Sequence, residues 1–506
     1  MSVTVPLPFH ATTFIEPYKL DDVGKYEACK VDEACLGGSI CAPEYKQGSM
    51  LCKDCSTGAY RQQDGSCKRC PNAPASLLAL LGGAVIFAAM AAVVVGGLAA
   101  KQFQKRVDSD GEVGGVKRAP HTLSLAVIFL QVLGILAKAP LKWPKPPVKQ
   151  ILEAANVANV DLSFFAIDCS LPSFVVRYSI SMLLPLLFGG VFLAILVLVK
   201  HVPALRCCFF RGVDASRVRV VDISLWAIFT FGPLVYIPLS RAALVFFDCT
   251  QYPDGKWYLD AEPSLQCFVG KWLATLELAI MGVGLYVVAL PILFAAVLYK
   301  YRHSLRSPLV TLRYGSLYAV FRQHYYYAGM PVMFKRLLIV IFSVFASNVQ
   351  IILFSGLLVV FVTSMLLLTK YSPYTYHPLN VIETKLDLSI VALLVAGLLF
   401  WMDEFPNDGT YAVFVVLVLG VIGYAAATLV VGLIRELRHH RASARQVGIN
   451  GGNDENNEHN TMFLAWVRKF APELSGSVRA AVRDLLGSDS GGADYDGSSG
   501  GSVEMV

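Results

Sequence analysis

The sequence predicts an all-α polytopic membrane protein with about nine transmembrane helices and a small disulfide-rich extracellular domain. Three observations predict this fold class. Hydrophobic residues make up 55% of the 506 residues and charged residues only 16%, whereas soluble domains carry about 25% charged residues. Nine apolar stretches are long enough to cross a bilayer, which takes about 20 residues each. Most of the cysteines fall on one side of the resulting topology.

The chain divides into three predicted parts. These are an extracellular cysteine-rich domain at 1–75, mainly 41–71; a helical bundle at 76–435; and a cytoplasmic, largely disordered tail at 436–506 with short amphipathic helices at 461–486. The predicted spans are 76–100, 121–141, 178–200, 221–247, 271–299, 332–347, 350–369, 386–402 and 411–434. A single stretch could be a soluble core helix, but nine in series leave too little polar sequence to cover such a core.

The placement of lysine and arginine predicts an outer N-terminus and an inner C-terminus. Four inner segments are basic, and their charges are Lys101, Lys105, Arg106, Lys117, Arg118; Arg206, Arg211, Arg217, Arg219; Lys300, Arg302, Arg306, Arg313, Arg322, Lys335, Arg336; and Arg435, Arg438, Arg441, Arg445. One predicted outer loop does not fit this rule, because it is basic as well and contains Lys138, Lys142, Lys145 and Lys149. This orientation predicts a multi-pass protein of the plasma membrane whose cysteine-rich domain faces outward.

Ten of the twelve cysteines lie outside in this topology, an even number that full disulfide pairing requires. They are Cys29, Cys35, Cys41, Cys52, Cys55, Cys67, Cys70, Cys169, Cys249 and Cys267. Residues 41–71 are too few to bury a sufficient core, which favours covalent cross-links. The two C-x2-C pairs also fit a zinc site, an alternative that a reducing compartment would favour.

Two pairings follow from position along the chain. Cys249 and Cys267 lie at the two ends of one outer loop, which predicts a disulfide between them. The seven cysteines of the N-terminal domain are an odd number, so one is expected to bond to Cys169. The competing arrangement joins Cys169 to one of the two loop cysteines. Cys207 and Cys208, at the inner end of the third span, are candidates for S-palmitoylation or are inert thiols.

Several segments resemble one family. The segment LCKDCSTGAYRQQDGSCKRCP is similar to an ephrin-receptor-like, EGF-like cysteine-rich repeat that precedes the membrane region of large protist and algal surface proteins, with Ala59 in place of its first aromatic residue. Residues 130–144, 156–174, 248–267 and 312–340 resemble that family's membrane region, so the resemblance covers about 41–435. Such regions are described as similar to transient-receptor-potential (TRP) channels, including the fungal flavin-carrier and polycystin-like branch. The resemblance therefore implies an ion channel.

Charges inside a bilayer are costly and indicate function or a buried pair. Arg241 and Glu277 lie at similar depth in successive spans, which predicts an ion pair that Lys138 can join. This pair can be structural or part of an ion pathway. Asp222 and Asp387 are expected at the inner rim, in contact with solvent. The basic, tyrosine-rich segment 300–334 is expected at the lipid headgroups, as an anchor or as a sensor of lipid.

Several functions are excluded by missing patterns. No span repeats arginine or lysine every third residue as a voltage sensor does, and no histidine pair at matching depth can hold a haem. Catalytic, metal and nucleotide motifs are absent, so we expect neither an enzyme nor a cofactor. No basic, aromatic-rich patch indicates nucleic acid. The loop from Met402 to Thr410 is too short for a pore helix and filter, a departure from the TRP-type pore.

The sequence thus favours a TRP-like cation channel or mechanosensitive conductance whose path runs between helices. Its expected partners are membrane lipids, inorganic cations and further copies of the chain. Two other functions stay open: a non-conducting surface receptor or adhesion anchor, and a lipid scramblase or small-solute carrier.

Overall fold

A computed structural model describes residues 34–37, 40–49, 52, 54–61, 66–70, 82, 85–86, 90, 121–138, 143, 148–159, 169, 173–202, 219–251, 255–347, 349–402 and 408–448. Most of the predicted span 76–100 lies outside these residues. So do Cys29, Cys207, Cys208 and the predicted amphipathic helices at 461–486.

Within the described residues, seven helical segments are long and apolar enough to cross a membrane. They are Phe174–Val199, Val220–Phe247, Gly270–Tyr301, Gln323–Phe345, Gln350–Tyr371, His377–Met402 and Gly409–His439. Each overlaps one predicted span. The predicted span 121–141 corresponds to a shorter apolar helix of 18 residues, or about 27 Å, close to the thickness of a bilayer core.

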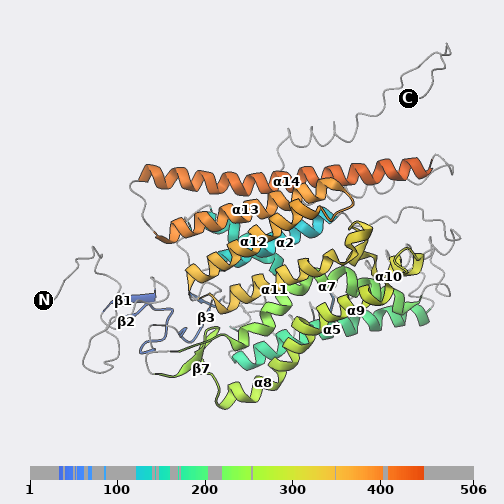
Figure 1. Ribbon diagram of the computed structural model, residues 1–506. Helices are drawn as coiled ribbons and strands as arrows, with labels where there is room; N and C mark the ends of the chain where they lie inside the picture. Colours follow the sequence, from blue (N-terminus) through green and yellow to red (C-terminus); the bar gives the residue numbers. More distant parts are fainter. Residues whose placement is uncertain are drawn as a thin grey trace, which may run out of the picture. The chain divides into compact units, whose positions relative to one another are not determined.

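The helices run alongside one another (Figure 1). In chain order they are α2 His121–Lys138, α3 Val148–Ala155, the short η3 Asn156–Asn159, α5 Phe174–His201, α7 Val220–Leu244, η5 Val245–Phe247, α8 Gly270–Gly282, the π-helical η6 Val283–Ala289, α9 Leu290–Tyr301, α10 Pro308–Tyr318, η7 Gln323–Ala328, α11 Gly329–Phe345, α12 Gln350–Tyr371, α13 His377–Met402 and α14 Asp408–Gly448. A short link after Phe345 joins α11 to α12, two helices that pack on each other.

The largest apolar core lies among α2, α11, α12, α13 and α14. Its fully buried side chains include Leu136, Phe354 and Leu394. A second core joins α5, α7 and α8 through small residues: a Cβ on Gly282 would lie 2.7 Å from the Met182 sulfur. Glycine at this position therefore permits the close approach of α8 to α5.

Prolines inside these helices free backbone carbonyls, because proline has no N–H to donate to the residue four positions earlier. Pro238 in α7 leaves the Leu234 carbonyl, which accepts a 2.9 Å hydrogen bond from Gln131 Nε2 of α2. Pro291 in α9 leaves the Val287 carbonyl, which accepts a 3.0 Å bond from the Tyr236 hydroxyl. Polar side chains of neighbouring helices thus complete the broken ladders, as a lipid environment requires.

The loop between α7 and α8 forms a three-stranded antiparallel sheet of β5 Cys249–Gln251, β6 Trp257–Leu259 and β7 Glu262–Gln266. The Cys249–Cys267 disulfide closes it, which is the pairing that the loop predicted. Arg177 of α5 pairs with Glu262 at 2.9 Å and ties the sheet to a second helix.

The cysteine-rich domain contains two hairpins. The first joins β1 Cys35–Gly37 to β2 Ile40–Cys41, and the second joins β3 Ala59–Arg61 to β4 Cys67–Arg69. Its disulfides are Cys41–Cys52 and Cys55–Cys67, and Cys70 bonds to Cys169 of the membrane region. The four cysteines of the zinc alternative therefore belong to three separate disulfides. Buried Tyr45 fills the small core, and its hydroxyl accepts a hydrogen bond from the Cys67 amide.

Part of the segment 300–334 packs onto the bundle through α10. Buried Tyr314 and Tyr318 of α10 pack with Phe229 and Phe294 of α7 and α9. Burial raises the pKa of Tyr314 above its usual value, and the neighbouring Tyr301 adds to the effect. Asp222 of α7 is buried and pairs with Arg313 of α10 at 2.6 Å. The expectation that Asp222 lies at a solvated rim is therefore wrong, because α10 covers it.

Candidate functional site

The described residues place a group of buried charges inside the helical bundle. Arg336 of α11, Glu383 and Asp387 of α13, and Glu436 of α14 are each 7% exposed or less. Lys335 of α11 joins them with a side chain 14% exposed. Such charges in spanning helices are costly unless they are paired, and they are the first candidates for a functional site.

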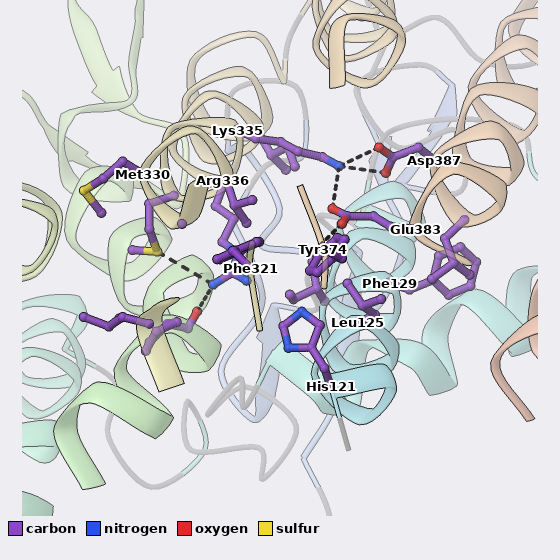
Figure 2. A pocket seen from close by; sticks show the side chains of 18 of the residues that line it. His121, Leu125, Phe129, Phe321, Met330, Lys335, Arg336, Tyr374, Glu383 and Asp387 are labelled. Carbon is purple, nitrogen blue, oxygen red and sulfur yellow. Dashed lines mark hydrogen bonds and ion pairs between the residues drawn. The ribbon is translucent and has the colours of Figure 1, made fainter. Parts of the chain in front are cut away.

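Lys335 lies at the centre of this polar cluster, which we define as Lys335, Ser364, Glu383 and Asp387 (Figure 2). Its Nζ lies 2.7 and 2.8 Å from the two oxygens of Asp387, 2.8 Å from the Ser364 hydroxyl and 3.8 Å from Glu383 Oε1. The Ser364 hydroxyl also donates to Asp387, over 2.7 Å. One ammonium group thus serves two carboxylates, and α11, α12 and α13 meet at this point.

Tyr374, in the loop between α12 and α13, completes the coordination of Glu383. Its hydroxyl donates a hydrogen bond to Glu383 Oε2. Burial raises the pKa of Tyr374 well above its usual value, and the Glu383 charge raises it further, so the hydroxyl stays protonated and remains a donor. The His121 and Phe321 rings flank Tyr374 at 5.3 and 5.1 Å between centroids.

Arg336 is adjacent in sequence but faces a different direction. Its guanidinium donates to the Pro233 carbonyl of α7 and lies 3.7 Å from the Met333 sulfur. Its buried Nε has no hydrogen-bond acceptor among the residues that the structure describes. Figure 2 shows Lys335 directed toward Asp387 and Arg336 directed away from it.

A cavity of about 100 Å³ lies beside these charges. It is bounded by α2, α7, α9, α10, α11, α12 and α13, and its polar lining residues are His121, Ser316, Lys335, Arg336, Tyr374, Glu383 and Asp387. Most of its wall is apolar, as at Leu125, Phe129 and Leu298. The cavity is large enough to hold more than one water molecule.

Glu436 of α14 closes the start of α2. Its two carboxylate oxygens accept hydrogen bonds from the backbone amides of His121 and Thr122 at 2.7 and 2.9 Å, and from the Thr122 hydroxyl at 2.6 Å. A carboxylate at a helix N-terminus satisfies free amides and complements the helix dipole. The ring of His439, one turn further along α14, lies 4.6 Å from the Tyr376 ring between centroids, with the two planes tilted. The last spanning helix therefore contacts both the start of α2 and the loop before α13.

The predicted pair of Arg241 and Glu277 is not formed. Glu277 is exposed on α8, two residues from Ala279, which is fully buried against α7 and α5. Residues two apart lie on nearly opposite sides of a helix, so α8 packs through Ala279 and turns Glu277 outward. Arg241 is half-buried in α7, and Lys138 is the last residue of α2.

The expectation that Asp387 lies at the inner rim is also wrong. The helix predicted at 386–402 begins at His377, so Asp387 is ten residues inside it and 3% exposed. Likewise, Lys335 and Arg336 were counted among the inner charges, at the start of the predicted span 332–347, but α11 begins earlier, at Gly329. A signal was present: Leu379, Glu383, Leu386, Ile390, Leu393 and Gly397 follow the spacing of a buried helical stripe, and two carboxylates fall on or beside it.

Comparisons with known proteins give one partial similarity. Cysteine repeat modular protein A of Toxoplasma gondii is 24% identical over 185 residues, which covers 33% of this chain and 6% of that protein. The match thus represents a small part of the length of that protein. No protein-family model and no solved structure match the chain. Together with the described disulfides, the similarity supports a cysteine-rich repeat in the N-terminal region of a multi-pass membrane protein.

Proposed function

We propose that the chain is a TRP-like membrane protein that conducts small cations along a path between its helices. The observation that carries this proposal is the polar cluster within the bundle, beside a cavity lined by residues of α2, α11 and α13. Carboxylate and hydroxyl oxygens are the groups that replace the water shell of a cation. In this proposal Asp387 and Glu383 attract the ion and Lys335 regulates entry.

A path between helices fits the connection of the last two spans. α13 ends at Met402 and α14 begins at Asp408, so residues 403–407 are all that join them. Such a link is too short for a pore helix and a filter. The proposal includes an outer N-terminus, an inner C-terminus, a span at 76–100, a location in the plasma membrane, association of several copies and no catalytic activity.

Reconstitution into liposomes tests conduction, with single-channel current and lipid flipping measured on the same preparation. We expect cation current from the wild-type chain and none from the double variant Lys335→Met, Asp387→Leu, which removes both charges while retaining apolar volume. Glu277→Gln is the matched control, because Glu277 is a carboxylate of a spanning helix outside the cluster. It is expected to leave the current unchanged.

The double variant separates a structural role from a conducting one. Current that persists in a folded double variant would make the cluster a structural ion pair and reject the proposed path. Lipid flipping without current would identify a scramblase.

A second candidate function is a surface receptor or adhesion anchor. The Cys70–Cys169 bond favours it, because this bond fixes the cysteine-rich domain covalently to the membrane region. A folded wild-type chain that gives neither current nor lipid flipping would favour this alternative.

A further inference from the structure

The polar cluster holds two carboxylates and one ammonium (Figure 2). Glu383 and Asp387 are four residues apart on α13, so they lie on the same side of the helix, about 6 Å apart along its axis. The Lys335 ammonium contacts both oxygens of Asp387 at 2.7 and 2.8 Å and lies 3.8 Å from Glu383 Oε1. The ammonium therefore has one hydrogen-bonded carboxylate and a second carboxylate within reach of its flexible side chain.

Other elements of the bundle present few polar groups to these carboxylates within the described residues. The groups are Lys335 and Arg336 of α11, Ser364 of α12, Tyr374 of the loop that follows α12, and His121 of α2. Glu436 of α14 is directed to the start of α2 instead. The two cations and two carboxylates that line the cavity cancel in charge. A metal cation that entered the cavity would therefore meet no surplus of negative charge.

The hydrogen bonds within the cluster narrow the choice of ion. A metal cation in a protein exchanges its water shell for about six oxygen ligands. Here both oxygens of Asp387 accept from Lys335, and Glu383 Oε2 accepts from the Tyr374 hydroxyl. The cavity has a volume of about 100 Å³ and a mostly apolar wall, so it has room for roughly three water molecules. These groups cannot replace the shell of a metal ion unless the cluster comes apart.

A proton requires none of these ligands. It moves along hydrogen bonds between titratable groups and water, and carboxylates inside membranes form proton relays in this way. Glu383 and Asp387 provide two proton acceptors at successive turns of α13, and both line the cavity. We propose that the ion which passes through the cluster is the proton, relayed by these two carboxylates. This inference rests on the proposed conduction and specifies its ion.

Each step of the relay forms one O–H bond and breaks another. A hydronium ion in the cavity protonates Glu383 at Oε1, the oxygen on the side of Lys335, and becomes water. A second water then takes this proton and passes it to Asp387, while the ammonium moves from Asp387 to the Glu383 carboxylate. Lys335 stays protonated, so one carboxylate is neutral and the other is paired while a proton is bound. Release of the proton from Asp387 to water restores the starting state.

The test records current from the full chain reconstituted in liposomes. Tenfold gradients of protons, sodium or potassium are applied in turn, with the large cation N-methylglucamine replacing the other ions, and an enclosed pH-sensitive dye reports proton entry. We expect the reversal potential to follow the proton gradient. We expect no change in it when the sodium or the potassium gradient is applied.

Glu383→Gln separates a relay from a structural ion pair. Glutamine resembles a carboxyl group that is permanently protonated, and Lys335 keeps its contacts with Asp387, so the variant is expected to fold. Its amide does not take up and release a proton, so we expect proton flux to fall by about tenfold or more. Asp387→Asn applies the same test to the second carboxylate. Glu277→Gln, on an exposed surface of α8, is the matched control and is expected to retain the wild-type flux.

Three results would overturn the inference, and each has a different meaning. A current that reverses with the sodium or potassium gradient keeps the proposed conduction but rejects the proton as its ion. Equal proton flux in the wild type and in folded Glu383→Gln places the path outside the cluster. A folded wild-type chain that gives neither current nor proton flux rejects the conduction and the relay together. If neither variant of the cluster folds, the three gradients applied to the wild type still decide the ion.

Discussion

The loop between α7 and α8 and the polar cluster stabilise the same bundle by different means. In the loop, β5, β6 and β7 are neighbours in sequence, and a disulfide joins residues 18 apart. In the cluster, Lys335 and Asp387 are 52 residues apart and join α11 to α13 through a hydrogen-bonded ion pair with no covalent link. The disulfide holds its loop by a covalent bond. Removal of one partner of a buried ion pair instead leaves an uncompensated charge inside the bundle. We therefore expect loss of the disulfide to destabilise only the loop, and loss of one charge of the cluster to lower the folding free energy of the whole bundle.

The largest effect is expected from Asp387→Leu. This change leaves the Lys335 ammonium buried with Glu383 as its remaining carboxylate at 3.8 Å, which should cost about 3–5 kcal/mol of folding free energy. Denaturation in mixed micelles would measure it. Adding Lys335→Met should restore most of the loss, because an apolar pair of similar volume replaces the ion pair. A single variant as stable as the wild type would contradict the comparison.

A smaller and more local effect is expected from replacing Cys249 and Cys267 together with alanine. The chain-entropy estimate for a loop of this length is about 3 kcal/mol. Hydrogen exchange should show faster exchange in 249–267, with α11 and α13 unchanged. Loss of protection that spread into α13 would show that the loop and the cluster are coupled.

Glu436→Gln should cost about 1–2 kcal/mol, because the neutral amide retains one acceptor but loses the charge at the start of α2. The readout is hydrogen exchange at His121 and Thr122. Glu277→Gln, on an exposed surface of α8, serves as the control and should change stability little. Equal effects of the two substitutions would deny Glu436 its role as a cap.

The smallest effect is expected from Tyr236→Phe, at about 1 kcal/mol. The substitution removes the donor to the Val287 carbonyl that Pro291 leaves free. Thermal melting compares it with Tyr299→Phe, since Tyr299 is 68% exposed. If both variants melt like the wild type, the Val287 carbonyl has another donor.

Sequence reasoning succeeded where the determinants are local. The spans follow from apolar length alone, so each of the seven described candidates overlaps a predicted one. The Cys249–Cys267 bond was predictable because both cysteines lie in one loop and a turn lies between them. The bond to Cys169 followed from an odd count, but the count did not identify Cys70 as its partner.

The polar cluster was missed for a physical reason. Hydropathy treats a charge as the end of a span, so Lys335 and Asp387 were placed at helix ends. A charge can lie deeper when a partner from another helix neutralises it, and hydropathy contains no information on pairing between helices. The predicted ion pair of Arg241 and Glu277 was wrong for a different reason. Equal depth in two spans does not determine the side of the helix on which each residue lies.

The Cys70–Cys169 bond also constrains how often the chain between these two cysteines crosses the membrane. Two cysteines bond only when they reach the same compartment, so the chain between them must cross the bilayer an even number of times. A crossing by α2, which lies between the two cysteines, therefore requires a second crossing, and the apolar stretch at 76–100 is the candidate that the sequence offers. The same parity places Cys249 on the same side of the membrane as Cys169, because the two spans α5 and α7 separate them. One sulfur–sulfur bond thus reports on the topology of a stretch of chain that it does not touch.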